Sequence, residues 1–510
     1  MHTMVKAFFF LLLALVLTIS FQFNYFNVAS PGQFSTLKDG SESLVFGKIF
    51  ADLIGKDTER SNLGFIQKDS VVKNEGVFAA AKRIEYPEGV LAAKITDQYW
   101  LNGFSRHVNQ FIVDRATTSK VGYESADFYP GQHITTPDCI PREVTGVDIG
   151  EQYLTVNYSG IQVKASYLTS TARIQSSNQN YDYQPYYQQY GLQGKLLSYL
   201  FQHVSFLKSA DDLRFLFSAL LAIVILLVAG ELGRSFSWLF AACFFVSMMF
   251  SPQIVGFARN LYWATFLWFL PLYFSLVIYR KQESKKMQYL FFFLFALSVA
   301  LKSLTGYEYL PTILIFSVFI YFVAPFTTSC KYSFRDSSLM VGKFILFSIA
   351  GFLFAVVLHL GMRSDTLATG IHNTFAFDAI KYLPISTSAN AYDAVSVTAI
   401  LKEYVINWRQ PFIYGFDASY WFSIVCFVAL CMLMVIKAYD PKLFTRDVIL
   451  LAVTLLAPLS WFVVMARHAK IHVHLDYVLW YLGFIPALFF VIAHATFVFS
   501  RVIFRRVSKI

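Results

Sequence analysis

Charged residues and cysteines are both scarce in this chain. Asp, Glu, Lys and Arg make up 15% of the 510 residues, whereas hydrophobic residues make up 56%. Soluble globular domains carry about 25% charged residues, so the composition excludes an ordinary soluble protein. The five cysteines form no CxxC pair and no Cys/His spacing of the kind that binds zinc. Between residues 24 and 212 the chain has only Cys139, so that region cannot hold an internal disulfide.

Sequence patterns for nucleotide and hydrolytic chemistry are missing as well. No GxxxxGK, GxGxxG, HExxH or GxSxG pattern supports ATP hydrolysis, dinucleotide binding, zinc-protease chemistry or a serine nucleophile. The 42 Lys and Arg exceed the 32 Asp and Glu, which gives a formal charge of +10. Much of this excess lies in short loops and near the C-terminus, so we do not expect nucleic acid as a partner.

Long apolar runs are what the chain has in abundance. The first extends from residue 7 to about residue 23, and we interpret it as a retained membrane helix, with a cleaved signal peptide as the alternative. Nine further runs lie near 213–231, 235–250, 261–279, 287–301, 309–326, 341–362, 420–437, 447–466 and 477–499. Because about 20 apolar residues cross a bilayer, the sequence predicts a polytopic α-helical membrane protein with about ten transmembrane helices.

The loops between these runs set the predicted orientation. With the N-terminus in the cytoplasm, every cytoplasmic loop carries Lys or Arg, as the positive-inside rule requires. The C-terminal segment 501–509 is basic and is cytoplasmic in the same frame. We therefore expect a multi-pass protein of a bacterial inner (plasma) membrane with both termini in the cytoplasm. The non-cytoplasmic segments are then 24–212, 251–260, 302–308, 363–419 and 467–476.

The polar region at 24–212 predicts a small α+β domain, exported between the first membrane helix (1–23) and a membrane domain of about nine helices (213–510). Residues 153–167 alternate in the manner of strands, and residues 44–53 and 76–83 are helix-like. Residues 176–190, rich in Asn, Gln and Tyr, predict a loop or an aromatic surface suited to sugars, and residues 191–203 predict an amphipathic segment that returns to the membrane.

An acidic pair, Asp39 and Glu42, lies a short way beyond the first apolar run. Helix capping is the ordinary explanation, with Ser41 as the N-cap and Glu42 in the first turn of the following helix. The functional alternative is that one of the two carboxylates acts as a general base on an acceptor hydroxyl. A carboxylate at a membrane boundary can have a raised pKa, which suits that role.

Ionisable residues also mark two short outer loops. Arg259 precedes an aromatic pair, where it either reaches the interface by its long side chain or binds phosphate through two parallel hydrogen bonds. Lys302, Tyr307 and Glu308 lie in a tight loop, where Lys302 and Glu308 either form a salt bridge or bind substrate. Ionisable groups at membrane depth are functional hypotheses by default.

The segment 467–476 is the most basic of the outer loops. Its polar residues alternate with apolar ones, so an extended chain would place them on one face. Arg, Lys and protonatable His together suit phosphate; the other interpretations are lipid head groups and a metal. The basic neighbours disfavour a cation, so we assign no metal and no other cofactor. The donor-phosphate residues proposed here are Arg467, His468, Lys470, His472 and His474.

The chain resembles the GT-C class of polyprenyl-phosphate-dependent glycosyltransferases. The resemblance rests on one membrane helix followed by an exported loop with early acidic residues at 39–42, on the helix entry at 259–263 and on the basic outer loop at 467–474. The resemblance is architectural and covers most of the chain. It implies that Asp39 or Glu42 is the base and that Arg259, Arg467 and Lys470 hold the donor phosphate. Asp39 lies roughly 16 residues beyond the first run, farther than is usual in the class.

The resemblance implies transfer of a sugar from a polyprenyl-phosphate donor to a cell-envelope glycan, lipid or protein on the non-cytoplasmic side. Membrane lipid is the other expected partner. A flippase or transporter of lipid-linked glycans is the main alternative, although the sequence shows no internal repeat of the kind common in transporters. A polymerase or ligase using the same lipid-phosphate chemistry, and a non-catalytic envelope scaffold, are the remaining alternatives.

Overall fold

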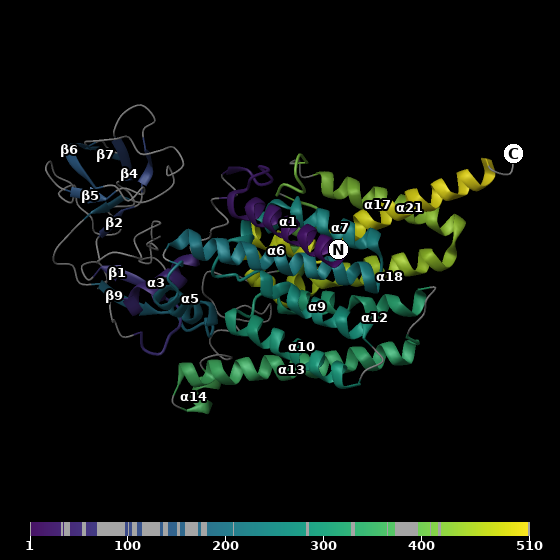
Figure 1. The fold of residues 1–510 in the computed structure, drawn as a ribbon. Coiled ribbons are helices and arrows are strands. Elements are labelled where there is room, and N and C mark those ends of the chain that lie inside the picture. Colours follow the sequence, from purple (N-terminus) through teal and green to yellow (C-terminus); the bar gives the residue numbers. More distant parts are fainter. Residues whose placement is uncertain are drawn as a thin grey trace. The chain divides into compact units, whose positions relative to one another are not determined.

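The chain folds into two compact units, which we call the helical unit (Met1–Lys38 with Phe215–Ile510) and the mixed unit (Asp39–Arg214). Figure 1 traces both units in a computed structural model. The described residues are 2–31, 34, 41–53, 58–68, 97–99, 101–104, 110–114, 133–135, 141–149, 153–158, 172–174, 181–207, 209–281, 285–327, 332–364, 366–372, 396–408, 410–416 and 420–507.

The helical unit consists of long helices joined by short connections. The long helices are α1 (His2–Phe23), α6 (Ala210–Ser235, of which residues 210–214 belong to the mixed unit), α7 (Trp238–Met249), α9 (Phe266–Arg280), α10 (Lys285–Thr305), α13 (Phe334–Arg363), α17 (Tyr420–Tyr439), α18 (Pro441–Val464) and α21 (Phe484–Val507). The short ones are α8 (Pro252–Ala258), α11 (Leu310–Ser317), α12 (Phe319–Val323), η4 (Ala324–Phe326), α14 (Leu367–Ile371), α16 (Val397–Val405), α19 (Ala466–Ile471), α20 (Val473–Asp476) and η6 (Tyr477–Tyr481).

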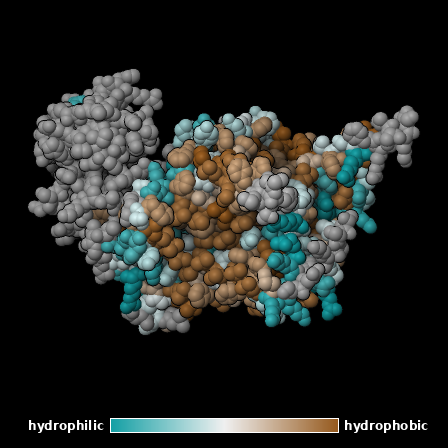
Figure 2. All heavy atoms as spheres, viewed as in Figure 1, coloured by the Kyte–Doolittle hydropathy of each residue, from teal (hydrophilic) through white to brown (hydrophobic). Residues whose placement is uncertain are grey.

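Six of these helices are long and apolar enough to cross a membrane, and the pair α7 and α8, bent by 67°, would make a seventh. The N-terminal stretch Ala7–Phe23 and helix α9 are apolar but shorter. Figure 2 shows hydrophobic side chains covering the flank of the helical unit, as expected of a surface that faces lipid. A multi-pass helical membrane protein is therefore the supported fold class, and the number ten stays a prediction.

Two of the predicted apolar runs differ in detail from the structure. The run predicted at 309–326 is divided into α11, α12 and η4 rather than forming one helix. The run predicted to begin at residue 261 becomes helical only at Phe266, because the side chain of Asn260 accepts hydrogen bonds from the backbone N–H groups of Tyr262 (2.9 Å) and Trp263 (3.3 Å). Such an Asx-type turn competes with the first turn of a helix.

Close backbone approach and aromatic contacts hold the helices of this unit together. Helix α10 packs along α13 and α9, and α17 packs against α21 and α18. A Cβ atom at Gly351 of α13 would lie 2.3 Å from the carbonyl oxygen of Ala296 in α10, so the α10–α13 contact depends on this glycine. A core of phenylalanine rings joins α7, α12 and α21; its members are Phe236, Phe240, Phe319 and Phe490.

One end of the helical unit carries paired basic residues, and we call it the basic end. The buried carboxylates Glu231 and Asp447 lie there; their partners are Arg234 (2.7 Å) and Arg280 (2.8 Å) for Glu231, and Arg446 (2.6 Å) and His494 (2.6 Å) for Asp447. The predicted cytoplasmic loops are the connections at this end. Buried carboxylates with two partners each are satisfied structural pairs, so we assign no chemistry to them.

The mixed unit contains two helices and two antiparallel sheets. The helices are α3 (Glu42–Leu53) and α5 (Leu192–His203), and a two-stranded sheet pairs β1 (Gly64–Lys68) with β9 (Tyr181–Pro185). The second sheet has the order β2-β8-β5-β6-β7-β4-β3; its strands are β2 (Asp97–Tyr99), β3 (Leu101–Phe104), β4 (Gln110–Asp114), β5 (His133–Thr135), β6 (Pro141–Ile149), β7 (Tyr153–Tyr158) and β8 (Ala172–Ile174).

Several sequence-based expectations for this unit can be compared with the structure. The helix predicted at 44–53 is α3, the amphipathic segment predicted at 191–203 forms α5, and the first part of the stretch 153–167 is β7. The prediction of a loop at 176–190 was wrong in part, because β9 lies within it and pairs with β1, a partner more than 100 residues away in the sequence. The helix expected at 76–83 lies outside the described residues.

Glycines bring α3 and α5 onto the segment that leads into β1. A Cβ atom at Gly47 of α3 would lie 1.9 Å from the carbonyl oxygen of Gly64, and one at Gly194 of α5 would lie 2.0 Å from that of Asn62. Both helices therefore pack directly on this backbone, which only glycine permits at such distances.

Candidate functional site

Three connections of the helical unit meet at one end of the bundle. They join α8 to α9, α10 to α11, and α18 to α21, and in the sequence they correspond to three of the predicted outer loops. Side chains from all three come together around one buried carboxylate. We call this set the Asp476 cluster; its members are Trp263, Tyr309, Trp461, His468 and Asp476.

Asp476 is fully buried at the centre of the cluster. The phenol of Tyr309 donates a hydrogen bond to Oδ1 at 2.7 Å, and the indole N–H of Trp461 donates to Oδ2 at 2.9 Å. The Nδ1 atom of His468 lies 3.7 Å from Oδ2. A carboxylate removed from water needs such donors, because an unsatisfied buried charge is costly. The arrangement fixes the two connections that carry Tyr309 and Asp476 to each other.

Tyr309 adopts an unusual backbone conformation to reach this position. Its φ is 65°, in the left-handed region that bulky residues rarely occupy. The ring stacks on Trp263 (centroids 5.3 Å apart, planes 8° apart) and meets the edge of Trp461 at 5.2 Å. Burial raises the pKa of the phenol and the neighbouring Asp476 raises it further, so Tyr309 remains a neutral donor. Strain of this kind persists where the surroundings over-determine it, often at functional sites.

The basic segment is helical, not extended, so the prediction that its polar residues share one face was wrong. It forms α19 and α20, with Ala466, Ala469 and Leu475 fully buried, whereas Ile471 is exposed. Helical spacing of buried alanines outweighed the alternation that suggested an extended chain. The basic side chains consequently divide between two environments: Arg467 and His468 are buried, His472 is half-buried, and Lys470 and His474 are exposed.

The histidine rings of this segment lie near one another. The centroids of His468 and His472 are 4.4 Å apart, and those of His472 and His474 are 6.3 Å apart. Within the described part of the chain, no three His, Cys, Asp or Glu side chains are grouped so that they could hold a metal ion.

Lys302 and Glu308 lie in the neighbouring connection and are not in ion-pair contact. The ammonium of Lys302, at the end of α10, is buried and donates to the carbonyl oxygen of Gly306 at 2.7 Å. Glu308 is half-buried and accepts a hydrogen bond from the phenol of Tyr262 at 3.3 Å. Among the described residues Glu308 has no basic partner within 4.0 Å, so the simple salt bridge considered from the sequence does not form.

Tyr307 completes this connection. Its hydroxyl lies 2.9 Å from Nδ1 of His359, a fully buried residue of α13. Burial raises the pKa of Tyr307, Glu308 raises it further, and Arg363 opposes the rise. The stretch 302–308 therefore contains an ammonium, a carboxylate and a phenol, and the phenol is paired with an imidazole of α13.

The remaining predicted residues lie elsewhere. Arg259 ends α8, and its guanidinium is stacked 3.7 Å from the ring centroid of Phe34 and donates to the carbonyl oxygen of that residue at 3.2 Å. Glu42, in the mixed unit, is buried and pairs with Arg214 at 2.8 Å, with the Nε of Arg214 3.3 Å from each carboxylate oxygen. Asp39 lies outside the described residues.

Sequence reasoning missed three members of the arrangement. Asp476 ends the basic segment but was not singled out, and Tyr309 and Trp461 looked like ordinary aromatic residues at helix ends. His359 had a detectable signal, because a single imidazole inside the apolar run at 341–362 is unusual for a membrane helix. The pairing of Tyr309 with Asp476 had no detectable signal in the sequence, since the two residues are 167 positions apart.

Comparisons of the chain with protein-family models, with curated proteins and with solved structures found no match.

Proposed function

We propose that this protein is an integral-membrane glycosyltransferase that moves a sugar from a polyprenyl-phosphate donor to a hydroxyl of a cell-envelope glycan, lipid or protein. The reaction takes place on the non-cytoplasmic side, at the end of the helical unit that carries the Asp476 cluster. One observation supports it above the others: acidic, basic and aromatic side chains from three separate connections converge at this end of an otherwise apolar bundle. Ionisable groups in such places are retained for function more often than for stability.

The proposed step is a direct displacement. The acceptor hydroxyl gives its proton to a carboxylate while its oxygen forms a bond to the anomeric carbon of the donor sugar. The bond between that carbon and the phosphate oxygen breaks, and polyprenyl phosphate leaves with the bonding electrons. Developing negative charge on the phosphate needs preorganised positive groups, which usually supply the largest catalytic contribution.

Glu308 is the carboxylate that we assign as base. It is half-buried and has only the phenol of Tyr262 as a hydrogen-bond donor within the described chain, so it is open to an acceptor hydroxyl. Glu42 suits the role less well, because Arg214 occupies its carboxylate in a buried pair. Asp39 stays a sequence-based candidate. Lys470 and His474, both exposed on the basic segment, are the proposed first contacts of the donor phosphate, with Arg467 and His468 behind them.

A transfer assay with matched variants tests this proposal. Purified protein receives a panel of radiolabelled polyprenyl-phosphate sugars with membrane extract as acceptor. We expect Glu308→Gln to lower kcat by about 10²–10⁴-fold, the usual contribution of a general base, and Lys470→Ala to raise KM for the donor. Lys286→Ala, an exposed lysine at the basic end, is the control and should behave as wild type.

The other outcomes assign the reaction differently. Collapse of transfer in Asp39→Asn, with Glu308→Gln active, would move the base to Asp39 and keep the transferase. Absence of transfer by the wild-type protein with every donor in the panel would overturn the proposal.

A lipid-linked glycan flippase is the second candidate, and a specific observation favours it. Helices α7 and α8 meet at a bend of 67°, and the run 309–326 is broken into three pieces. Transporters commonly bind substrate at such broken helices. Movement of a fluorescent lipid-linked glycan across proteoliposomes by the wild-type protein, without transfer of label, would support the flippase over the transferase.

A further inference from the structure

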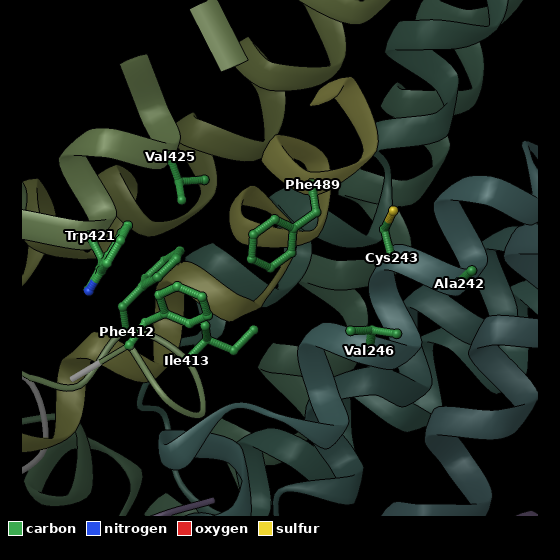
Figure 3. Close-up of a pocket in the computed structure, with 9 residues that line it drawn as sticks. Ala242, Cys243, Val246, Phe412, Ile413, Trp421, Val425 and Phe489 are labelled. Carbon is green, nitrogen blue, oxygen red and sulfur yellow. The ribbon is translucent and has the colours of Figure 1, made fainter. Parts of the chain in front are cut away.

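Apolar surfaces are expected in the helical unit, but those of the mixed unit need an explanation. In the helical unit apolar side chains cover the flank seen in Figure 2, and others, such as Phe412 and Phe489, line the cavity of about 400 Å³ that Figure 3 shows between α7, α17 and α21. In the described part of the mixed unit, only three large hydrophobic side chains are exposed. All three lie on α5 or the turn that follows it; they are Leu196 (48% exposed), Tyr199 (59%) and Phe206 (76%).

Helix α5 cannot turn these side chains inward, because its other face is already packed. Gly194 and Ser198 of that face are buried. A Cβ atom at Gly194 would lie 2.0 Å from the backbone that leads into β1, and the hydroxyl of Ser198 donates to a carboxylate of α3. Leu196, Tyr199 and His203 follow one another at intervals of three and four residues, so they share the opposite face. We call this the outer face of α5, and the fold of the mixed unit fixes its outward direction.

The outer face combines apolar area with polar ends. The rings of Tyr199 and His203 are stacked, with centroids 4.2 Å apart and planes 20° apart, and Lys195 is exposed beside Leu196. The phenol, imidazole and ammonium groups of such side chains can stay in water or among lipid head groups while the apolar part of each side chain enters a bilayer. Apolar side chains flanked by these groups are typical of a helix that lies at a membrane surface.

The chain keeps α5 close to a membrane crossing. Helix α5 ends at His203, and α6, one of the six helices apolar enough to cross a membrane, begins at Ala210. The connection 204–209, which carries Phe206, can extend by at most about 25 Å. The outer face of α5 is therefore within reach of the surface at which α6 enters the bilayer.

An ion pair attaches the same part of the mixed unit to α6. Arg214, in the second turn of α6, pairs at 2.8 Å with Glu42, in the first turn of α3, and α3 packs along α5 (Figure 1). Helix α6 continues without a break from this pair to Ser235. The two helices α3 and α5 are thus held at the start of the crossing, where a bilayer surface is the nearest apolar partner.

We infer that the outer face of α5, together with the turn at Phe206, docks on the surface of the membrane that α6 crosses. Leu196, Tyr199 and Phe206 enter the boundary between head groups and hydrocarbon, while Lys195 stays among the head groups. This contact holds the mixed unit against the bilayer. The inference does not depend on glycosyl transfer, because it concerns the lipid surface alone.

Lipid photolabelling tests the contact in the full-length protein without any substitution. Wild-type protein is irradiated in phosphatidylcholine nanodiscs that contain a phosphatidylcholine with a trifluoromethylphenyl diazirine in the upper part of one acyl chain, and labelled peptides are mapped by mass spectrometry. We expect label on the peptide 196–208, as on a peptide of α13 that contains the exposed Leu353. The peptide that contains Glu59 and Arg60, exposed residues of the same unit, should stay unlabelled. Label on α13 without label on 196–208 would overturn the inference.

A triple variant tests whether the three apolar side chains make the contact. Leu196→Ser, Tyr199→Ser and Phe206→Ser together should abolish label on 196–208 and keep label on α13. The unfolding midpoint should stay that of wild type, because the three side chains are exposed in the unit. Arg60→Ser, at an exposed position outside α5, is the control and should be labelled as wild type.

Two results would assign the outer face differently. Undiminished label on 196–208 in the triple variant would mean that the three side chains do not make the contact. A wild-type protein that is dimeric in nanodiscs, with a monomeric triple variant, would show that the face binds a second copy of the chain, and it would overturn the inference.

Discussion

The hydroxyl of Tyr309 donates a 2.7 Å hydrogen bond to Asp476 across 167 positions of sequence, from a backbone held at a φ of 65°. Left-handed backbone at a bulky residue costs about 1–3 kcal/mol. The hydrogen bond to a buried carboxylate and the stack on Trp263 offset that cost. This pair consequently fixes the connection that carries Glu308 relative to the basic segment, and both are needed for the proposed reaction.

Removing the Tyr309 hydroxyl should destabilise the helical unit. Tyr309→Phe keeps the stack on Trp263 but leaves Asp476 with one hydrogen-bond donor fewer, which should cost about 1–3 kcal/mol. The expected result is a lower midpoint of thermal unfolding in detergent. Tyr289→Phe, at a tyrosine exposed on α10, is the matched control and should leave the midpoint unchanged. An unchanged midpoint in Tyr309→Phe would mean that the hydrogen bond does not stabilise the unit.

The same phenol predicts a loss of stability in alkali. Burial and Asp476 raise the pKa of Tyr309 above its unfolded value of about 10. The folded protein therefore binds this proton more tightly than the unfolded chain does. The stability that results is fully present below about pH 10 and decreases as pH rises further. Unfolding midpoints measured from pH 8 to 11 should fall above pH 10, and the fall should be smaller in Tyr309→Phe. Equal slopes in the two proteins would contradict this prediction.

The pair of Glu42 and Arg214 predicts strong coupling within the mixed unit. Removing Arg214 takes the guanidinium partner from a buried carboxylate, a change that typically costs about 3–5 kcal/mol. Removing Glu42 should cost less, because Arg214 keeps its ion pair with Asp211 at 3.2 Å. Replacing both members of a buried pair by apolar residues often costs much less than removing one. Glu42→Leu and Arg214→Met should each speed proteolysis of the unit, and the double variant should recover much of the resistance. A Glu42→Gln protein that keeps full resistance but loses glycosyl transfer would instead support Glu42 as the base.

Sequence periodicity was sufficient to predict the long membrane helices but not to predict the structure of the connections between them. Apolar runs mark helices such as α13 and α18 because each segment must satisfy its own backbone hydrogen bonds in lipid. The basic segment was misjudged because alternation over a few residues does not distinguish a strand from two short helices. The strand β9 was missed for a different reason, since it depends on pairing with β1 from a distant part of the chain.

The sequence predicted that two of the connections lie on the same side of the membrane, but it did not predict which of their side chains pair. The positive-inside argument put residues 302–308 and 467–476 on one side of the membrane, and the structure brings Tyr309 next to Asp476. The positive-inside argument could not reveal that Lys302 and Glu308 do not form an ion pair. It also could not reveal that the ring of Phe34 stacks on the guanidinium of Arg259. Such partners are set by tertiary packing, which a single sequence does not encode in any local pattern.

Two glycines of α13 should respond in opposite ways to the same change. A Cβ atom at Gly351 would lie 2.3 Å from a backbone oxygen of α10, so Gly351→Ala must move the two helices apart and should cost about 1–3 kcal/mol, as overpacking does. Nothing lies within 4 Å of a Cβ atom at Gly342, so Gly342→Ala should be neutral or stabilise by up to about 1 kcal/mol through helix propensity. Thermal unfolding of the two variants measures both effects, and similar shifts in both would contradict the packing of α10 on α13.

Substitution of Lys302 should abolish glycosyl transfer without changing the stability of the protein. Its ammonium is buried at the end of α10 and donates to the oxygen of Gly306, with no carboxylate within ion-pair distance among the described residues. An unpaired buried ammonium carries a desolvation cost that an apolar side chain of similar volume avoids, and this gain offsets the hydrogen bond lost at the oxygen of Gly306. We therefore expect Lys302→Met to keep the unfolding midpoint of wild type while losing glycosyl transfer, because the positive charge near Glu308 is removed from the site. Lys302→Arg restores the charge and should recover part of the activity. A Lys302→Met protein that unfolds early would make the lysine structural, and one that transfers sugar normally would exclude it from the site.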